Sequence, residues 1–219
     1  GNGQPWDLDR LYGGVHTLPP YEQAKGTDWY KGTANAIYQN ISFIDSYDPE
    51  YVIILSGDQI CKQDYADFLR FHKEKGAEFS VAVMEVDWKE ASRFGLMVAD
   101  EDDRITEFQE KPPVPKSNLA SMGIYIFNWD VLKKYLEEDE ADPNSKNDFG
   151  MNIIPALLRD GRKMYAYHFN GYWRDVGTID SLWEANMEVL DPENSGIDIF
   201  DEKWKIYSRN PVLPAQKIG

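Results

Sequence analysis

The sequence predicts an α/β fold, with a mixed, mainly parallel sheet flanked by helices. Short apolar or β-branched runs, typical of strands, alternate with segments in which apolar residues recur every three or four positions, typical of amphipathic helices. The 219 residues are 42% hydrophobic and include 7 Trp and 13 Tyr, which is enough to build a packed core. We therefore expect one large folded domain.

Composition also indicates which classes of protein to exclude. The net charge of −15 argues against a nucleic-acid partner, because phosphate contacts require clustered Lys and Arg. The single cysteine, Cys61, cannot form an internal disulfide, and the first ten residues do not resemble a signal peptide. No apolar run approaches the roughly 18–20 residues of a membrane helix. We therefore expect a cytoplasmic protein without a membrane segment.

The first half of the chain shows a clear order of elements. Residues 1–27 are irregular, and the apolar spacing of residues 34–44 predicts a helix. The run YVIIL at 51–55 predicts a buried strand, because it is short and apolar on both faces. A helix is expected from Asp64, with Gly76 as its stop.

The second half continues the alternation. We expect strands at 79–86, 120–127 and 163–169, with a further short strand at 172–176. A hairpin is expected from 94–99 and 105–108, around the acidic turn at 100–103. Helices are expected at 129–138 and 151–159, and from an N-cap at Thr178 to Leu190. Residues 191–219 contain several prolines without a helical period, so they are interpreted as a linker after a domain of residues 1–190.

Two aspartates are candidates for a metal site. Asp58 follows the buried strand behind Gly57, and Asp175 follows a short strand and precedes a helix. Ligands of open α/β sheets bind beyond the strand ends, and Mg²⁺ is commonly held by one or two carboxylates together with phosphates and water. Position alone also fits aspartates that merely stabilise a turn or a helix end.

Lys111 is the best candidate for a cation that meets a phosphate. It ends a predicted strand and precedes Pro112, which restrains its backbone. A solvated surface lysine is the simpler interpretation from these residues by themselves. Gly95 and Ser121 are weak signals, and the three histidines show no metal-ligand spacing.

Several long strings resemble one family, the ADP-glucose pyrophosphorylases, over nearly the whole chain. The strings are WYKGTANAIYQN at 29–40, YVIILSGDQI at 51–60, FGLM at 94–97, ITEFQEKP at 105–112, ASMGIYIFNWDVL at 120–132, FGMNIIP at 149–155 and GYWRDVGTIDSLWEAN at 171–186. Shorter matches, WDLDR at 6–10 and LPP at 18–20, open the chain.

The resemblance implies a Rossmann-like nucleotidyltransferase catalytic domain over 1–190 and, over 191–219, a linker toward a left-handed β-helix domain. It implies transfer of the adenylyl group of ATP to glucose 1-phosphate, with Mg²⁺ held by Asp58 and Asp175 as the catalytic and metal-binding pair. Five residues would line the sugar-phosphate and ADP-glucose site: Tyr30, Gly95, Glu110, Lys111 and Ser121. Lys111 would contact the sugar phosphate, and Glu110 would bind sugar hydroxyls or orient that lysine.

The chain departs from the family pattern in two ways. Gln59 and Cys61 stand where the family usually has His and Tyr. The family also begins with a glycine-rich, arginine-bearing loop that receives the nucleotide phosphates, and no such loop is found here. We therefore interpret the chain as N-terminally truncated and expect it to be inactive by itself.

Other functions remain open at this stage. The full-length protein is expected to form a homo-oligomer, or a hetero-oligomer in which this chain is a catalytically weak subunit. A noncatalytic sugar-phosphate-binding or regulatory module is the alternative from another class, although it would not need the two aspartates. Transfer of a uridylyl or thymidylyl group also remains open.

Overall fold

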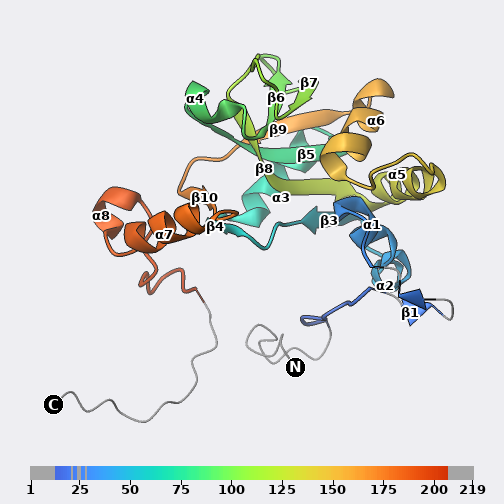
Figure 1. The fold of residues 1–219 in the computed structure, drawn as a ribbon, viewed down its shortest axis with the longest axis horizontal. Helices are drawn as coiled ribbons and strands as arrows, with labels where there is room; N and C mark the ends of the chain where they lie inside the picture. The colour runs from blue at the N-terminus through green and yellow to red at the C-terminus, as the bar shows by residue number, and fades with distance from the viewer. Residues whose placement is uncertain (1–12, 21, 24–25, 28, 207–219) are drawn as a thin grey trace, which may run out of the picture.

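The computed structural model describes residues 13–20, 22–23, 26–27 and 29–206. Its centre is a six-stranded sheet around one long strand, β8 (Leu119–Asn128) (Figure 1). Along one edge of β8 lies β5 (Phe79–Glu85), and β9 (Met164–His168) pairs with the outer edge of β5.

Two strands share the other edge of β8. β3 (Tyr51–Ile54) pairs with residues 125–128, and β6 (Gly95–Ala99) pairs with residues 119–120. β7 (Ile105–Glu110) extends the sheet from β6. Among the described strands, none pairs with residues 121–124 of β8 on this edge.

The sheet is mixed, as predicted, but the expected predominance of parallel pairs is wrong. Among the described strands of this sheet only β5 and β9 pair in parallel. β3 and β5 do run in the same direction, since both are antiparallel to β8, but β8 lies between them. Strand–helix alternation predicts the direction of successive strands, whereas it does not reveal that a later strand inserts between two earlier ones.

Helices cover both faces of the sheet. On one face, Phe79, Val81 and Phe127 pack in a core with residues of α1 (Thr33–Tyr38), α2 (Ile41–Asp45), α5 (Trp129–Ala141) and α6 (Ile154–Arg159). On the other face, Ala82 and Ile126 pack against Phe68 of α3 (Tyr65–Glu74). The two sets alternate along each strand, as the period of two of a β-strand requires.

Three local predictions need correction. The helix expected over 34–44 is divided into α1 and α2 at Asn40, whose side-chain amide donates to the Ala36 carbonyl at 2.8 Å; such side-chain bonds compete with the helical backbone. The helix expected from Met151 begins earlier, with one π-helical turn, η2 (Phe149–Ile153). The strand expected to be buried, β3, has Ile53 41% exposed, because β8 is its only described neighbour.

Most of the other elements agree with the sequence. The helix from Asp64 is α3, which Asp64 caps, and Gly76 follows it with a left-handed φ of +56°. The hairpin is β6–β7. Short elements that were not expected are β1 (Glu22–Gln23), β2 (Gly26–Thr27), β4 (Gln59–Cys61) and α4 (Trp88–Ala91).

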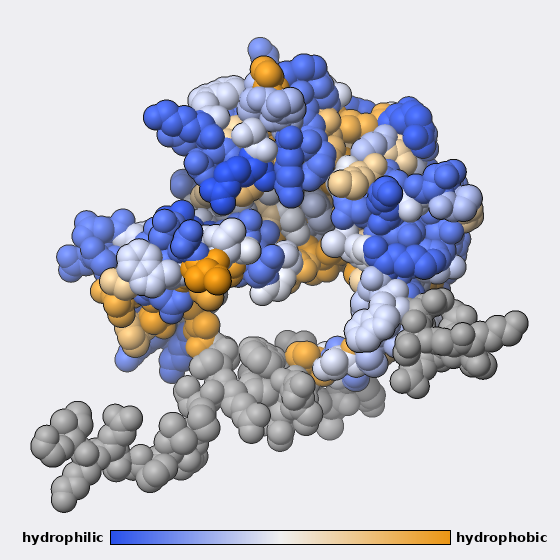
Figure 2. Space-filling model, viewed as in Figure 1, coloured by the Kyte–Doolittle hydropathy of each residue, from blue (hydrophilic) through white to orange (hydrophobic). Residues whose placement is uncertain are grey.

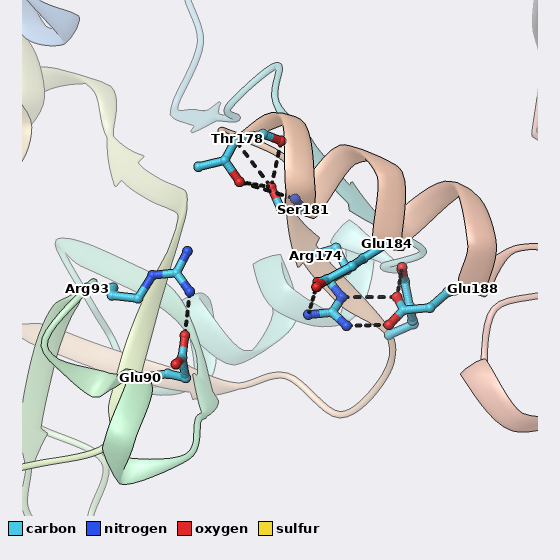
Figure 3. Close-up of polar contacts among 8 residues, drawn as sticks. Glu90, Arg93, Arg174, Thr178, Ser181, Glu184 and Glu188 are labelled. Atoms are coloured by element: carbon cyan, nitrogen blue, oxygen red, sulfur yellow. Dashed lines mark hydrogen bonds and ion pairs between the residues drawn. The ribbon is translucent and has the colours of Figure 1, made fainter.

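A smaller lobe follows the main sheet. β10 (Trp173–Asp175) pairs with β4 in a separate two-stranded ribbon and leads into α7 (Ile179–Glu188) (Figure 1). Thr178 caps α7, as predicted, in a reciprocal capping box with Ser181 (Figure 3). The region expected to lack helix contains the short α8 (Pro192–Ser195). The string at 6–10 and the expected approach to a β-helix at 207–219 lie outside the described residues.

The smaller lobe exposes several large apolar side chains. Ile179, Trp183 and Leu190 are exposed along α7 and just after it, and Figure 2 shows hydrophobic residues gathered over α7 and α8.

None of the described helices combines the length and the apolar character that a membrane crossing requires.

Candidate active site

A cavity of about 500 Å³ opens beside the part of β8 that lacks a strand partner. Its floor is produced by a bulge in β8. Val81 of β5 lies opposite Tyr125, and Val83 lies opposite Ser121, so four steps along β8 match two steps along β5. Gly123 lies in the bulge with φ +68°, a conformation that favours glycine.

Segments far apart in the sequence form the cavity wall. They are the start of α1, the residues after β3, the β4–β10 ribbon, the β6–β7 hairpin, β8 and the start of η2. The polar side chains among the lining residues are Thr33, Ser56, Gln59, Glu110, Ser121, Tyr125, Asp148, Trp173 and Asp175.

Glu110, predicted as a site residue, projects from the end of β7 into this cavity. Its Oε2 lies 3.1 Å from the position that a Cβ on Gly95 would occupy and 2.9 Å from that of a Cβ on Gly150. Two glycines therefore leave room for the carboxylate. Burial raises the pKa of Glu110, the charge of Lys111 lowers it, and the charge of Asp148 raises it.

Asp148 is a site residue that the sequence reasoning missed. Its Oδ1 accepts from the Met151 N–H at 3.0 Å at the start of η2, and its Oδ2 accepts from the Thr33 hydroxyl at 3.0 Å. The carboxylate thus joins α1 to η2 at the cavity wall. An aspartate that accepts a hydrogen bond from the N–H three residues later is typical of a helix N-cap. The sequence therefore indicates a helix start at Asp148, but it does not show that the residue lines a cavity.

Ser121, also predicted, lies at the edge of the bulge. Its Oγ accepts from the Gly123 N–H at 3.2 Å. Tyr125, two positions beyond Gly123, lines the same wall, and burial raises its pKa to about 12. Both hydroxyls are therefore neutral groups that can donate to or accept from a ligand.

The structure brings the segments of Asp58 and Asp175 together. In the β4–β10 ribbon Asp175 lies opposite Gln59, and the Val176 N–H donates to the Asp58 carbonyl at 2.9 Å. Asp175 lines the cavity and its Oδ1 accepts from the Gly177 N–H at 3.1 Å. Asp58 is exposed just outside the lining, where its carboxylate accepts from the Ser56 hydroxyl.

Two other predicted site residues lie away from the cavity wall. The Tyr30 hydroxyl donates to the Leu18 carbonyl at 2.7 Å and accepts from the Asn40 amide at 3.1 Å. Lys111 is exposed in a left-handed conformation with φ +43°, and its N–H donates to the Phe94 carbonyl at 3.2 Å. Its charge still acts on the neighbouring Glu110 carboxylate.

The position of Asp175 depends on contacts between β10 and α7. Arg174 donates to both carboxylate oxygens of Glu188, at 3.0 Å from Nε to Oε2 (Figure 3). The Tyr172 hydroxyl donates to Oε2 of the same carboxylate at 2.6 Å. The bond from Arg174 lowers the pKa of Glu188. Burial and the bond to Glu188 raise the pKa of Tyr172 to about 12. These contacts fix β10 against α7 just before Asp175 in the chain.

Comparison with known proteins agrees with this architecture. The sequence pattern of the nucleotidyl transferase family matches residues 7–192. The chain belongs to this family. Over all 219 residues this nucleotidyl transferase chain is 67% identical to a glucose-1-phosphate adenylyltransferase of Clostridium beijerinckii, and 65% and 61% identical to proteins of the same name from Clostridium acetobutylicum and Desulforamulus reducens. It spans 56%, 57% and 55% of their respective lengths.

The charged side chains that line the cavity of this nucleotidyl transferase chain are all acidic among the described residues. Its lining, among the described residues, contains the carboxylates of Glu110, Asp148 and Asp175 and no Lys, Arg or His. Such a wall suits sugar hydroxyls, which donate to carboxylates, and divalent cations. No cluster of three or more His, Cys, Asp or Glu ligands occurs within the described residues, but Mg²⁺ is commonly held by only one or two carboxylates. Asp175, at the end of β10, and Asp58, just before β4, carry carboxylate oxygens of this kind.

Proposed function

We propose that the protein containing this chain transfers the adenylyl group of ATP to glucose 1-phosphate, producing ADP-glucose and pyrophosphate. The proposal rests on the family, on the names of the similar proteins, and on one structural observation. Gly95, Glu110, Ser121 and Asp175, predicted from separate segments, all line one cavity. At about 500 Å³ this cavity falls in the usual range for small-molecule sites.

The sugar is proposed to bind against the wall formed by β7, β8 and η2. The carboxylates of Glu110 and Asp148 would accept hydrogen bonds from hydroxyls, and the Ser121 hydroxyl would add a donor. The rings of Phe94, Phe108 and Trp173 in the same wall supply apolar surface for the face of a sugar ring. Lys111, beside Glu110, would meet the sugar phosphate at the mouth of the cavity as a point charge.

Asp58 and Asp175 are proposed to hold Mg²⁺. When bound, the ion would neutralise phosphate charge next to the acidic wall. Asp175 is already oriented by the Gly177 N–H, and Asp58 by the Ser56 hydroxyl.

The proposed reaction requires no protein nucleophile. A phosphate oxygen of glucose 1-phosphate forms a bond to the α-phosphorus of ATP, the bond from that phosphorus to the oxygen bridging to the β-phosphate breaks, and pyrophosphate leaves. The chain contributes by placing the sugar phosphate in line and by excluding water, which is how positioning accelerates a displacement. Cys61 has a pKa raised by burial, so it stays a neutral thiol and plays no part.

A test uses the full-length protein that carries this chain. Pyrophosphate release is measured with glucose 1-phosphate and each of ATP, UTP and dTTP. The proposal requires release with ATP at least tenfold faster than with the other nucleotides. Release only with UTP or dTTP would replace the adenylyl assignment. Binding of glucose 1-phosphate without release would favour the noncatalytic subunit instead.

A further inference from the structure

The side-chain amide of Gln59 has no hydrogen-bond partner within the described chain. Its Oε1 is buried, and neither end of the amide bonds to another described residue. Buried polar atoms are normally paired, because leaving one without a partner costs free energy. Gln59 lies in the wall of the cavity, as does Trp173, whose buried Nε1 also lacks a partner within the described residues. A ligand bound in the cavity is therefore the natural partner for the amide.

Two features of the structure place this amide between Asp175 and Gly123. The β4–β10 ladder puts Gln59 directly opposite Asp175, and opposed residues in such a ladder project from the same face. Its Nε2 lies 3.2 Å from the position that a Cβ on Gly123 would occupy. The bulge in β8 therefore makes the space in which the amide sits, between Gly123 and Asp175.

The chemistry of the amide selects the kind of partner. In the orientation that the structure gives, the buried atom is the carbonyl oxygen, which needs a donor. Phosphate oxygens at neutral pH are acceptors, so a phosphate does not satisfy the amide in this orientation. A hydroxyl can donate to the carbonyl or accept from the amide nitrogen, whichever way the amide is turned. The amide is also neutral, unlike Glu110, Asp148 and Asp175 in the same wall, so it does not add to the repulsion of a sugar phosphate.

We propose that Gln59 binds one hydroxyl of the sugar and contributes to sugar specificity. This inference rests on the proposed function, because it takes the occupant of the cavity to be glucose 1-phosphate. A sugar lacking that hydroxyl leaves the buried amide without a partner, and sites built to bind a hydroxyl reject such analogues strongly.

The test compares wild type with Gln59→Leu, which removes the amide at similar volume, in the full-length protein that carries this chain. Binding of glucose 1-phosphate and of its monodeoxy analogues is measured by calorimetry. We expect Gln59→Leu to weaken glucose 1-phosphate by about tenfold. One deoxy analogue should bind wild type about tenfold more weakly and should be unaffected by the substitution. Equal loss for all analogues, or no loss, would overturn the inference.

Gln63→Leu is the matched control. Gln63 is a buried glutamine four residues away whose amide atoms also lack partners within the described part of the chain, but it does not line this cavity. Its substitution should leave sugar binding unchanged. Should Gln59→Leu fail to fold, as judged by its thermal transition, Gln59→Asn retains an amide but shortens its reach and should give the same analogue-specific loss.

Other outcomes separate the two proposals. A wild-type protein that does not bind glucose 1-phosphate would contradict the proposed function itself. Normal sugar binding in Gln59→Leu with weakened ATP would show that the amide contacts the nucleotide, which would overturn the inference and leave the proposed function intact.

Discussion

At the scale of single residues, Glu110 shows how neighbours set the properties of a carboxylate. Gly95 and Gly150 make room for its Oε2, which a Cβ at either position would approach to 3.1 or 2.9 Å. Burial raises its pKa more than the adjacent Lys111 lowers it. The ionised carboxylate is therefore less stable in the folded chain than in water, a cost that binding of hydroxyls would offset.

Glu110→Gln should stabilise the protein at neutral pH while reducing activity. A carboxyl group whose pKa is raised on folding destabilises the native state at pH values above that folded pKa, and the effect disappears below its ordinary value of 4.5. The gain in thermal midpoint should thus be clear at pH 7 and shrink as the pH falls toward 4.5. Glu101→Gln, in the exposed turn between β6 and β7, is the control and should change neither quantity. A variant less stable than wild type at pH 7 would contradict the explanation.

Lys111→Ala should weaken glucose 1-phosphate far more than ATP. The substitution removes a charge-assisted phosphate contact worth roughly 1.5–3 kcal/mol, or about ten- to a hundredfold in affinity. Steady-state kinetics on the full-length protein measure both substrates. Lys116→Ala is the control, because Lys116 is an exposed lysine paired with Glu107 at 2.7 Å. Unchanged affinity for the sugar phosphate would show that Lys111 does not contribute to binding it.

At the scale of elements, the cavity depends on how two pieces of regular structure are interrupted. β8 is continuous for ten residues, yet its bulge at Gly123 and its divided edge open the wall between β3 and β6. β10, which carries Asp175, is only three residues long. Its position is set by β4 on one side and by α7 on the other. Each element therefore positions the site through contacts that its own sequence pattern does not reveal.

Glu188→Gln should loosen the contact between α7 and β10 by about 1 kcal/mol, the scale of a partly exposed ion pair with good geometry. The pKa of Glu188 is lowered from its ordinary value of 4.5 by Arg174. Its stabilising contribution is then complete above about pH 4.5 and is lost as the pH falls through the folded pKa. Hydrogen exchange of the α7 amides at pH 7 should be faster in the variant, and the thermal midpoints should converge in acid. Glu184→Gln, whose carboxylate lies 3.9 Å from Arg174, should have little effect, and an equal effect would argue against the specific pair.

At the scale of the whole molecule, the charges of the cavity do not balance those of the proposed substrates. The described lining has three carboxylates and no cationic side chain, whereas a triphosphate and a sugar phosphate are strongly anionic. Ile53 of β3 and Leu55, just after this strand, are also 41% and 48% exposed, and strand edges with exposed apolar side chains favour association.

The 219-residue chain by itself should therefore turn over at least about a hundredfold more slowly than the full-length protein, because loss of one preorganised donor typically costs about 10²–10³ in rate. Pyrophosphate release with ATP, glucose 1-phosphate and Mg²⁺ measures both proteins under the same conditions. Light scattering on the same samples shows whether any loss of turnover is caused by aggregation. Equal turnover would show that the residues described here supply all the charge that the reaction needs.

The sequence by itself determined the order and type of most elements and the segments that carry the site. Asp64 and Thr178 predicted helix starts, the SGD and YWRDVGT strings drew attention to Asp58 and Asp175, and EFQEKP indicated Glu110. These signals are local, because caps, periodicity and motifs depend on residues a few positions apart. Only the tertiary structure decided that β8 inserts between β3 and β5, that Asp148 and Gln59 enter the cavity wall, and that Tyr30 and Lys111 lie outside it. Strand pairing and cavity walls depend on residues distant in sequence, and no local pattern carries that information.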